Sequence, residues 1–311
     1  MSQTSNEAQT QCFIETPIVI LIGEQNTPLV FNILANILLT FTAVLGNVSI
    51  LFSFVFVPSL RSISNYLIFG LALTDLGVGL IVHPLYIHVL LCVYNNRVPP
   101  CSVLAAYSIA TSFLSGISLL YITIIGLDRY LAIKLHLRYR ILVTEKRVGV
   151  TQIALWLINF LLNLVWLKGF RVYSTFAAVV VSMSLVVTFF VYAKVYQVVK
   201  RHRVHIQDQM ESQMSQFENF RSKRLRRSAI NTLYVFFIFL LCYLPFCVIT
   251  VLNNISNSLS KTNVLAFEFS ATLMLSNSSL NPIMYCIRLS GFRTAIKKTY
   301  RRMLCLKISY A

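Results

Sequence analysis

The sequence predicts an all-α membrane protein in which a bundle of seven transmembrane helices is followed by a short amphipathic eighth helix. Three observations support this fold class. Hydrophobic residues make up 57% of the 311 residues and charged residues only 12%, about half the charged share of a typical soluble domain. Seven apolar stretches are long enough to cross a bilayer, and the basic residues gather on one side of them.

The predicted spans follow from length, because a helix needs about 20 residues to cross the hydrocarbon core. They are Leu29–Val57, Asn65–Leu91, Cys101–Ile133, Arg147–Leu167, Tyr173–Val199, Ser228–Leu252 and Asn263–Ile287. Basic and apolar residues then alternate over Gly291–Leu306, which predicts a helix lying on the inner leaflet.

The chain is therefore expected to divide into an N-terminal tail (1–28), a seven-helix domain (29–290) and an amphipathic helix with a cytoplasmic tail (291–311). Within the domain, the polar residues 202–227 predict a mobile connector. Its last part, residues 221–227, is expected to extend the sixth helix.

The distribution of charge predicts the orientation in the membrane. The net charge is +17, and all but four of the 27 Lys and Arg residues fall on one side of the predicted spans. Basic residues in short loops stay in the cytoplasm, so we expect a multi-pass protein of the plasma membrane with an extracellular N-terminus. The same excess favours contact with anionic membrane lipid. It needs no nucleic-acid partner, and we expect none.

An acid within the second span is the first indication of function. Asp75 stands in the apolar run Leu71–Leu76, where a charge at mid-bilayer costs at least about 2.5 kcal/mol. It belongs to an ordered series with one motif in each of six spans: Gly46-Asn47, Leu71–Leu76, Asp128-Arg129-Tyr130, Trp156, Phe239–Pro245 and Asn281–Tyr285. Over roughly residues 30–305, this series resembles the signature of rhodopsin-like G-protein-coupled receptors.

The resemblance implies a receptor that transduces binding of an extracellular ligand into activation of a heterotrimeric G protein. It does not imply an enzyme, and the sequence contains no recognisable nucleophile–base pair, phosphate-binding loop or cluster of metal ligands. Two alternatives stay open at this point. A transporter or channel would need polar groups continuous along a path, and a signalling-impaired receptor would act as a partner of other proteins.

The resemblance also places the ligand, which could be a small molecule, a lipid or a peptide, between the third, fifth, sixth and seventh spans. Thr111 stands where aminergic receptors carry an Asp, and Leu275 where opsins carry the retinal Lys. We therefore expect neither an amine held through that Asp nor retinal. Glu268 and His88, nearer the mouth of the site, are interpreted as solvated surface residues; the alternative is that they meet a peptide or a polar headgroup. The expected lining, equally typical of helix packing, is Thr111, Ser112, Ser115, Tyr243, Phe246, Cys247 and Met274.

A second set of residues is implied to switch the receptor on. Asp128 would hold Arg129 at rest, and Arg129 would turn toward the cytoplasmic cavity on activation; the alternative is an ion pair that only anchors the helix. Prolines loosen a helix because each removes a backbone hydrogen bond. The full implied set is Asp128, Arg129, Tyr130, Tyr192, Phe239, Pro245, Asn281, Pro282 and Tyr285.

Asp75 needs polar partners, and the resemblance places Ser118, Asn277, Ser278 and Asn281 around it. A carboxylate with hydroxyl and amide oxygens is a hard donor set that could hold an allosteric Na⁺. The alternative is a protonated Asp75 in an ordinary hydrogen-bond network. We expect no other cofactor.

Several features depart from the family pattern or concern modification. The loop around residues 168–173 contains no Cys, so the usual disulfide from that loop cannot form, and two of Cys12, Cys92 and Cys101 are expected to pair. Tyr243 replaces the usual Trp, and Leu225 replaces an acid that pairs with Arg129 in some relatives. Cys305 is a candidate for palmitoylation, and Asn254 begins a glycosylation sequon.

Overall fold

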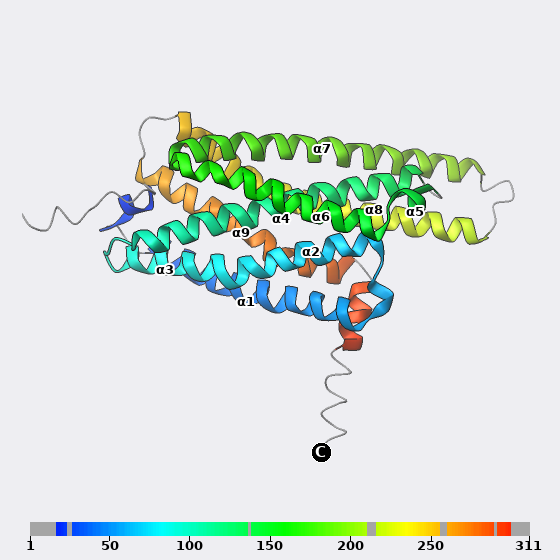
Figure 1. Ribbon diagram of the computed structural model, residues 1–311, viewed down its shortest axis with the longest axis horizontal. Helices are drawn as coiled ribbons and strands as arrows, with labels where there is room; N and C mark the ends of the chain where they lie inside the picture. Colours follow the sequence, from blue (N-terminus) through cyan, green and yellow to red (C-terminus); the bar gives the residue numbers. More distant parts are fainter. Residues whose placement is uncertain are drawn as a thin grey trace, which may run out of the picture.

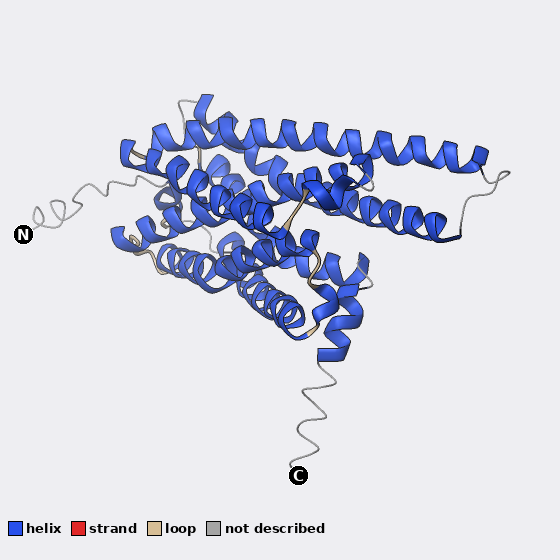
Figure 2. Ribbon diagram, turned by 45° about the vertical axis from the view of Figure 1, so that its right-hand side comes forward, coloured by secondary structure: helices blue, strands red, loops and turns tan. Residues whose placement is uncertain are grey.

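The computed structural model describes residues 17–23, 27–135, 138–209, 216–255, 260–288 and 291–299. Every regular element in these ranges is a helix (Figure 2). The long helices run side by side along one axis of the molecule (Figure 1). They are α1 (Thr27–Phe56), α2 (Ile63–Gly77), α3 (His83–Tyr94), α4 (Cys101–Leu135), α6 (Glu145–Asn163), α7 (Phe170–Gln209), α8 (Gln216–Ile255) and α9 (Lys261–Arg288).

Short elements connect or flank these helices. A π-helical turn, Val78–Val82, joins α2 to α3, so that the three form the second span. Three 3-10 turns cover Pro17–Leu21, Pro58–Leu60 and Leu164–Lys168, and the short helix α5 covers Tyr139–Leu142. Gly169 alone separates the last 3-10 turn from α7; its φ of +94° lies in the left-handed region that favours glycine.

Six helical stretches among the described residues are long and apolar enough to cross a membrane. The helix α9 is not among them because it carries buried polar residues such as Asn277, Ser278 and Asn281. These side chains face the bundle, since α9 packs against α1 and α8. With α9 as the seventh helix, the predicted all-α seven-helix bundle is confirmed.

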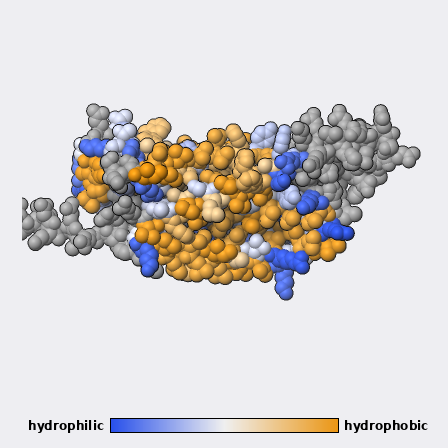
Figure 3. Space-filling view, turned by 90° about the horizontal axis from the view of Figure 1, so that it is seen from above, coloured by the Kyte–Doolittle hydropathy of each residue, from blue (hydrophilic) through white to orange (hydrophobic). Residues whose placement is uncertain are grey.

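The surface of the bundle is apolar where a bilayer would contact it. Leu38, Leu45 and Phe190 are 65%, 66% and 62% exposed, whereas Asn36, Asn47 and Asp75 are fully buried. Figure 3 shows the apolar surface in the middle of the molecule, with hydrophilic patches toward its two ends. Polar groups turned inward and apolar groups turned outward are what lipid requires of a helical bundle.

Two glycines allow helices to approach closely at the centre of the bundle. A Cβ atom on Gly46 of α1 would lie 2.7 Å from the Cβ atom of Pro282 in α9, and one on Gly126 of α4 would lie 2.6 Å from the ring of Tyr192 in α7. Neither site has room for a methyl group. Small residues at such crossings are typical of membrane helices, whose association depends on close packing.

The end of the bundle that is predicted to be cytoplasmic differs in extent from the sequence-based prediction. The helices α7 and α8 reach Gln209 and Gln216, well into the predicted connector 202–227, and α8 includes the predicted extension 221–227. Residues 291–299 are helical and, as Figure 1 shows, turn away from the axis of the bundle. Phe292, Ala295 and Thr299 form the buried face of this segment, in the amphipathic pattern predicted for it.

The structure partly answers which two of Cys12, Cys92 and Cys101 form a disulfide. Cys101 is disulfide-bonded and Cys92 is a free thiol. The partner of Cys101 is not one of the free cysteines among the described residues, and Cys12 and Cys305 lie outside those residues.

Candidate functional site

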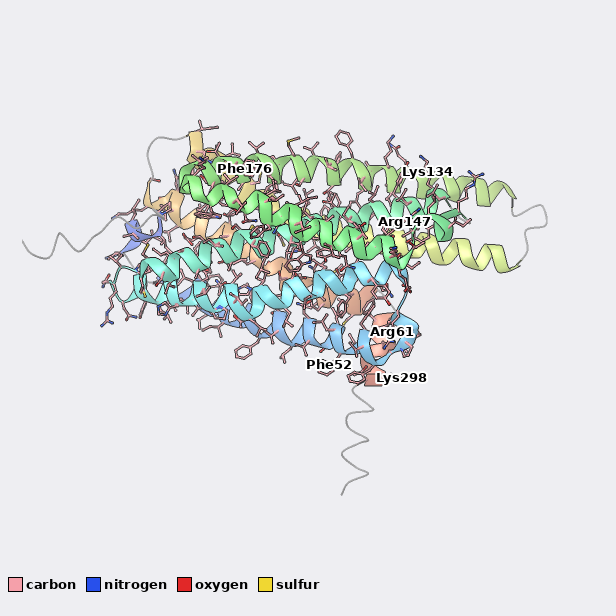
Figure 4. The ribbon with its side chains drawn as sticks, in the orientation of Figure 1. Phe52, Arg61, Lys134, Arg147, Phe176 and Lys298 are labelled. Atoms are coloured by element: carbon pink, nitrogen blue, oxygen red, sulfur yellow. The ribbon has the colours of Figure 1, made fainter. Side chains whose placement is uncertain are left out.

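A cavity of about 190 Å³ lies between α4, α6, α7, α8 and α9. Pro17 and Ile18 of the N-terminal 3-10 turn also line it, so it is at the predicted outer end of the bundle. Figure 4 labels one lining residue, Phe176, near that end, and Arg147 and Lys134 toward the other. The seven residues predicted to contact ligand all line this cavity: Thr111, Ser112, Ser115, Tyr243, Phe246, Cys247 and Met274.

Some of the polar groups predicted to meet a ligand already have partners within the protein. Ser112 Oγ donates to Asn163 Oδ1 at 2.7 Å and accepts from the indole N–H of Trp166 at 2.9 Å. Cys247 Sγ lies 3.1 Å from Ser182 Oγ. These contacts tie the helices around the cavity together, which leaves the groups less available to a ligand.

Tyr243 connects the cavity to the centre of the bundle. It is 3% exposed, and its hydroxyl donates to the backbone oxygen of Ser115 at 3.3 Å. The centroid of its ring lies 4.2 Å from that of Phe239, which is fully buried one turn earlier in α8. A ligand that contacts Tyr243 therefore presses on a side chain in direct contact with Phe239.

Glu268 is where the sequence-based interpretation is wrong. It is not a solvated surface residue: it is 5% exposed and lines the cavity. Its Oε2 accepts a hydrogen bond of 2.6 Å from the hydroxyl of Tyr86. The signal was present in the sequence, because Glu268 lies within the predicted seventh span, and an acid within a span indicates a functional site as it does for Asp75. His88, by contrast, is exposed.

Asp75, in α2, is surrounded by three side chains that donate hydrogen bonds to its carboxylate. Ser278 Oγ and Ser118 Oγ donate to Oδ1 at 2.8 and 3.3 Å, and Asn281 Nδ2 donates to Oδ2 at 2.8 Å. Asn277 is 1% exposed, and neither of its side-chain polar atoms has a hydrogen-bond partner among the described residues. Among the described residues no group of three His, Cys, Asp or Glu could hold a metal ion. The donors near Asp75 are instead hydroxyl and amide groups.

Near the C-terminal end of α4, Asp128 is held by two hydroxyl groups. Ser64 Oγ donates to its Oδ2 at 2.7 Å, and the hydroxyl of Tyr139 donates to its Oδ1. The guanidinium of Arg129 is further away, with Nη1 3.9 Å from Oδ2. Burial, and then the charge of Asp128, raise the pKa of the Tyr139 hydroxyl well above its ordinary value of 10.0.

The other residues of the predicted switch are spread along the bundle, with Asn281 at Asp75 and Phe239 at Tyr243. Tyr192 stacks on Phe236 with ring centroids 4.4 Å apart, and the hydroxyl of Tyr285 is buried without a partner among the described residues. Lys134 Nζ lies 5.5 Å from the ring of Tyr130. Pro245 and Pro282 both stand inside helices, α8 and α9.

Of the two predicted modification sites, Asn254 is among the described residues and Cys305 is not. Asn254 is half-buried at the end of α8, and its Oδ1 accepts a hydrogen bond from Ser174 Oγ at 3.2 Å. Ser256 of the sequon and Cys305 lie outside the described residues, as does the side chain of Leu225.

Comparison with known proteins gives one family. The model of the family described as "7 transmembrane receptor (rhodopsin family)" matches residues 46–172 and 163–285. The chain is 24% identical to adenosine receptor A2b of Gallus gallus in an alignment of 322 positions, gaps included. This alignment covers 90% of the chain and 91% of that receptor.

Two other relatives match more closely over shorter lengths. Adenosine receptor A3 of Canis lupus familiaris is 32% identical over 46% of the chain and 44% of that receptor. The histamine H2 receptor of Homo sapiens is 35% identical over 39% of the chain and 33% of that receptor. In these two comparisons the chain therefore spans less than half the length of the relative.

Proposed function

Because the chain belongs to the rhodopsin family of seven-transmembrane receptors, we propose that it couples an extracellular ligand, bound in the cavity beside Tyr243, to a heterotrimeric G protein that docks beside Arg129. The supporting observation is that one helix serves both ends. The helix α4 lines the cavity with Thr111 and Ser115 and carries Asp128 and Arg129 at its other end. A rise of about 1.5 Å per residue separates Ser115 from Arg129 by about 21 Å.

The ligand proposed for this cavity is a small molecule. A cavity of about 190 Å³ with a mainly apolar lining suits such ligands better than a folded peptide. Thr111 and Leu275 exclude an amine held by the Asp of aminergic receptors and retinal held as a Schiff base. The names of the relatives make adenosine and histamine the first ligands to test.

The proposed mechanism is a shift between two arrangements of the bundle. An agonist stabilises the arrangement that it binds better, and so raises its population. Asp128 keeps its bonds from Ser64 and Tyr139 when Arg129 moves away. Because no buried carboxylate is then left without a donor, the 3.9 Å ion pair can open at little cost. Arg129 would become available to the G protein.

We also propose that Asp75, Ser118 and Asn277 hold a sodium ion. The unpartnered side chain of Asn277 supports this assignment, because buried amide groups rarely lack a partner. When bound, the ion would supply a positive charge that compensates the buried carboxylate. Ser278 and Asn281 would orient that carboxylate through the bonds that they donate to it.

The proposed setting is the plasma membrane, with the N-terminus outside and the basic end of the bundle in the cytoplasm against anionic lipid. In this orientation Asn254 would be on the outer side, where glycosylation takes place, but its Nδ2, the atom that would carry the glycan, is buried. Cys305 would be on the cytoplasmic side, where palmitoylation takes place. The polar groups support a receptor rather than a channel, because among the described residues no hydrogen bond joins the donors around Asp75 to those around Glu268 or Asp128.

The test is a G-protein dissociation assay in cells with a promiscuous Gα subunit. Adenosine, histamine and a small-molecule library are applied to the wild type and to Arg129→Ala at matched surface expression. A response of the wild type that is lost in Arg129→Ala supports the proposal. A response of equal size in both would overturn it. Ligand-independent ion or solute flux through the wild type would favour the transporter or channel.

A further inference from the structure

Two of the buried acids, Asp75 and Glu268, differ in how well their charges are compensated. Asp75 accepts hydrogen bonds from the side chains of Ser118, Ser278 and Asn281. Glu268, which is 5% exposed, accepts from one side chain, the hydroxyl of Tyr86. A buried carboxylate with so few donors is costly unless a positive group approaches it.

No such positive group comes from the described part of the protein. The residues that line the cavity include Glu268 but no Lys, Arg or His. Among the described residues, Arg129 forms an ion pair with Asp128 at the opposite end of the bundle, and no ion pair involves Glu268. Oε1 of Glu268 has no hydrogen bond to any described residue, so one carboxylate oxygen remains for a ligand.

Neighbouring residues hold Glu268 in position. Asn32 Nδ2 donates to the Tyr86 oxygen at 3.2 Å, so the hydroxyl proton of Tyr86 points to Glu268. The ring of Tyr86 stacks on Tyr107, with centroids 4.9 Å apart and an interplanar angle of 6°. Tyr107 also lines the cavity. A cation beside Glu268 would therefore also have an aromatic ring nearby.

We propose that Glu268 is the anionic anchor of the ligand site and that the ligand is an organic amine, protonated at neutral pH, with an apolar or aromatic body. The ammonium group binds Glu268, and the body fills the apolar part of the cavity toward Tyr243 and Phe246. Tyr86 is a positioning residue. This assignment rests on the proposed receptor function because it names the ligand class of that same cavity. It places the anchor on α9, not at Thr111 of α4.

The experiment measures binding without a G protein, so that failure of the anchor and failure of coupling are distinguishable. Full-length receptor in lipid nanodiscs is titrated with two isosteric pairs, 2-phenylethylamine against 2-phenylethanol and tryptamine against tryptophol. Apparent affinities come from the ligand-induced shift in melting temperature. The wild type is expected to bind each amine at least about tenfold more tightly than its alcohol, as a charge-assisted hydrogen bond predicts.

Variants then assign that preference to Glu268. Glu268→Gln should remove it, Glu268→Asp should keep part of it, and Tyr86→Phe should reduce it without removing it. The matched control is Glu145→Gln, the same change at an exposed cytoplasmic acid, which should leave it intact.

Two results would overturn the assignment. One is equal or absent binding of amine and alcohol by the wild type, which needs no variant to fold. The other is an undiminished amine preference in Glu268→Gln. Amine binding without G-protein dissociation would instead keep the anchor and reject the coupling.

Discussion

The hydroxyl of Tyr139 donates a hydrogen bond to Asp128, and this bond joins the short helix α5 to the C-terminal part of α4. The neighbouring Arg129 remains 3.9 Å from the same carboxylate. Asp128 is therefore satisfied mainly by hydroxyl groups. The balance between these donors and Arg129 should set how easily the switch opens.

Tyr139→Phe removes one of those donors. The buried carboxylate of Asp128 then depends more on Arg129, so the ion pair should tighten and signalling should fall. A hydrogen bond to a charged group contributes about 1.5–3 kcal/mol, which corresponds to a shift of at least about tenfold in the concentration of agonist for half-maximal G-protein dissociation. Tyr196→Phe, at an exposed position of α7, is the control. A curve for Tyr139→Phe that superimposes on the wild type would contradict this prediction.

The same bond should be insensitive to pH in the physiological range. Because the pKa of Tyr139 is raised above 10.0 in the folded protein, its contribution to stability is fully present below pH 10 and is lost only as the pH rises through the folded-state pKa. The difference in melting temperature between the wild type and Tyr139→Phe should therefore stay constant from pH 6 to about pH 9. A difference that shrinks steadily over this range would mean that another group titrates at this contact.

Gly126→Ala should destabilise the bundle by about 1–3 kcal/mol, because the added methyl group meets the ring of Tyr192 at 2.6 Å. Gly149→Ala is a matched control in α6, where an added Cβ meets nothing within 4 Å. It should be neutral or stabilising by up to about 1 kcal/mol. Thermal unfolding in detergent compares the two variants. Equal melting temperatures would argue against the close contact between α4 and α7.

Sodium should stabilise the protein through Asp75. Replacing choline chloride by NaCl at equal ionic strength should raise the melting temperature of the wild type, with about 1.4 kcal/mol expected at ten times the Kd. Asp75→Asn and Asn277→Ala should abolish or weaken this response. The control is Ser53→Ala, which removes a buried hydroxyl in α1, away from these residues. This variant should keep the response to sodium. A wild type that melts alike in both salts would leave Asp75 as a member of a hydrogen-bond network only.

The sequence predicts the bundle well because bilayer thickness constrains each span in a way that composition records. Residues such as Thr111 and Tyr243 could be placed by counting from the motifs, and they do line the cavity. The contacts of Asp128 with Ser64 and Tyr139 were missed, because they join segments with no local pattern between them. The π-helical turn Val78–Val82 also has no signature in periodicity.

Glu268 was missed for a different reason. Its position within a predicted span carried the same physical signal as that of Asp75, but its neighbourhood was interpreted as solvated surface. The hydrogen bond from Tyr86 depends on how α3 and α9 meet, which a single sequence does not reveal.

Part of the wall around the cavity comes from Pro17 and Ile18, well ahead of residue 46, where the match to the family model begins. In the proposed receptor, changes in this short N-terminal segment would therefore alter ligand preference while every membrane-crossing segment stays the same. Swapping that peptide between two receptors would be a way to retune selectivity without touching the machinery that reports to the cell interior.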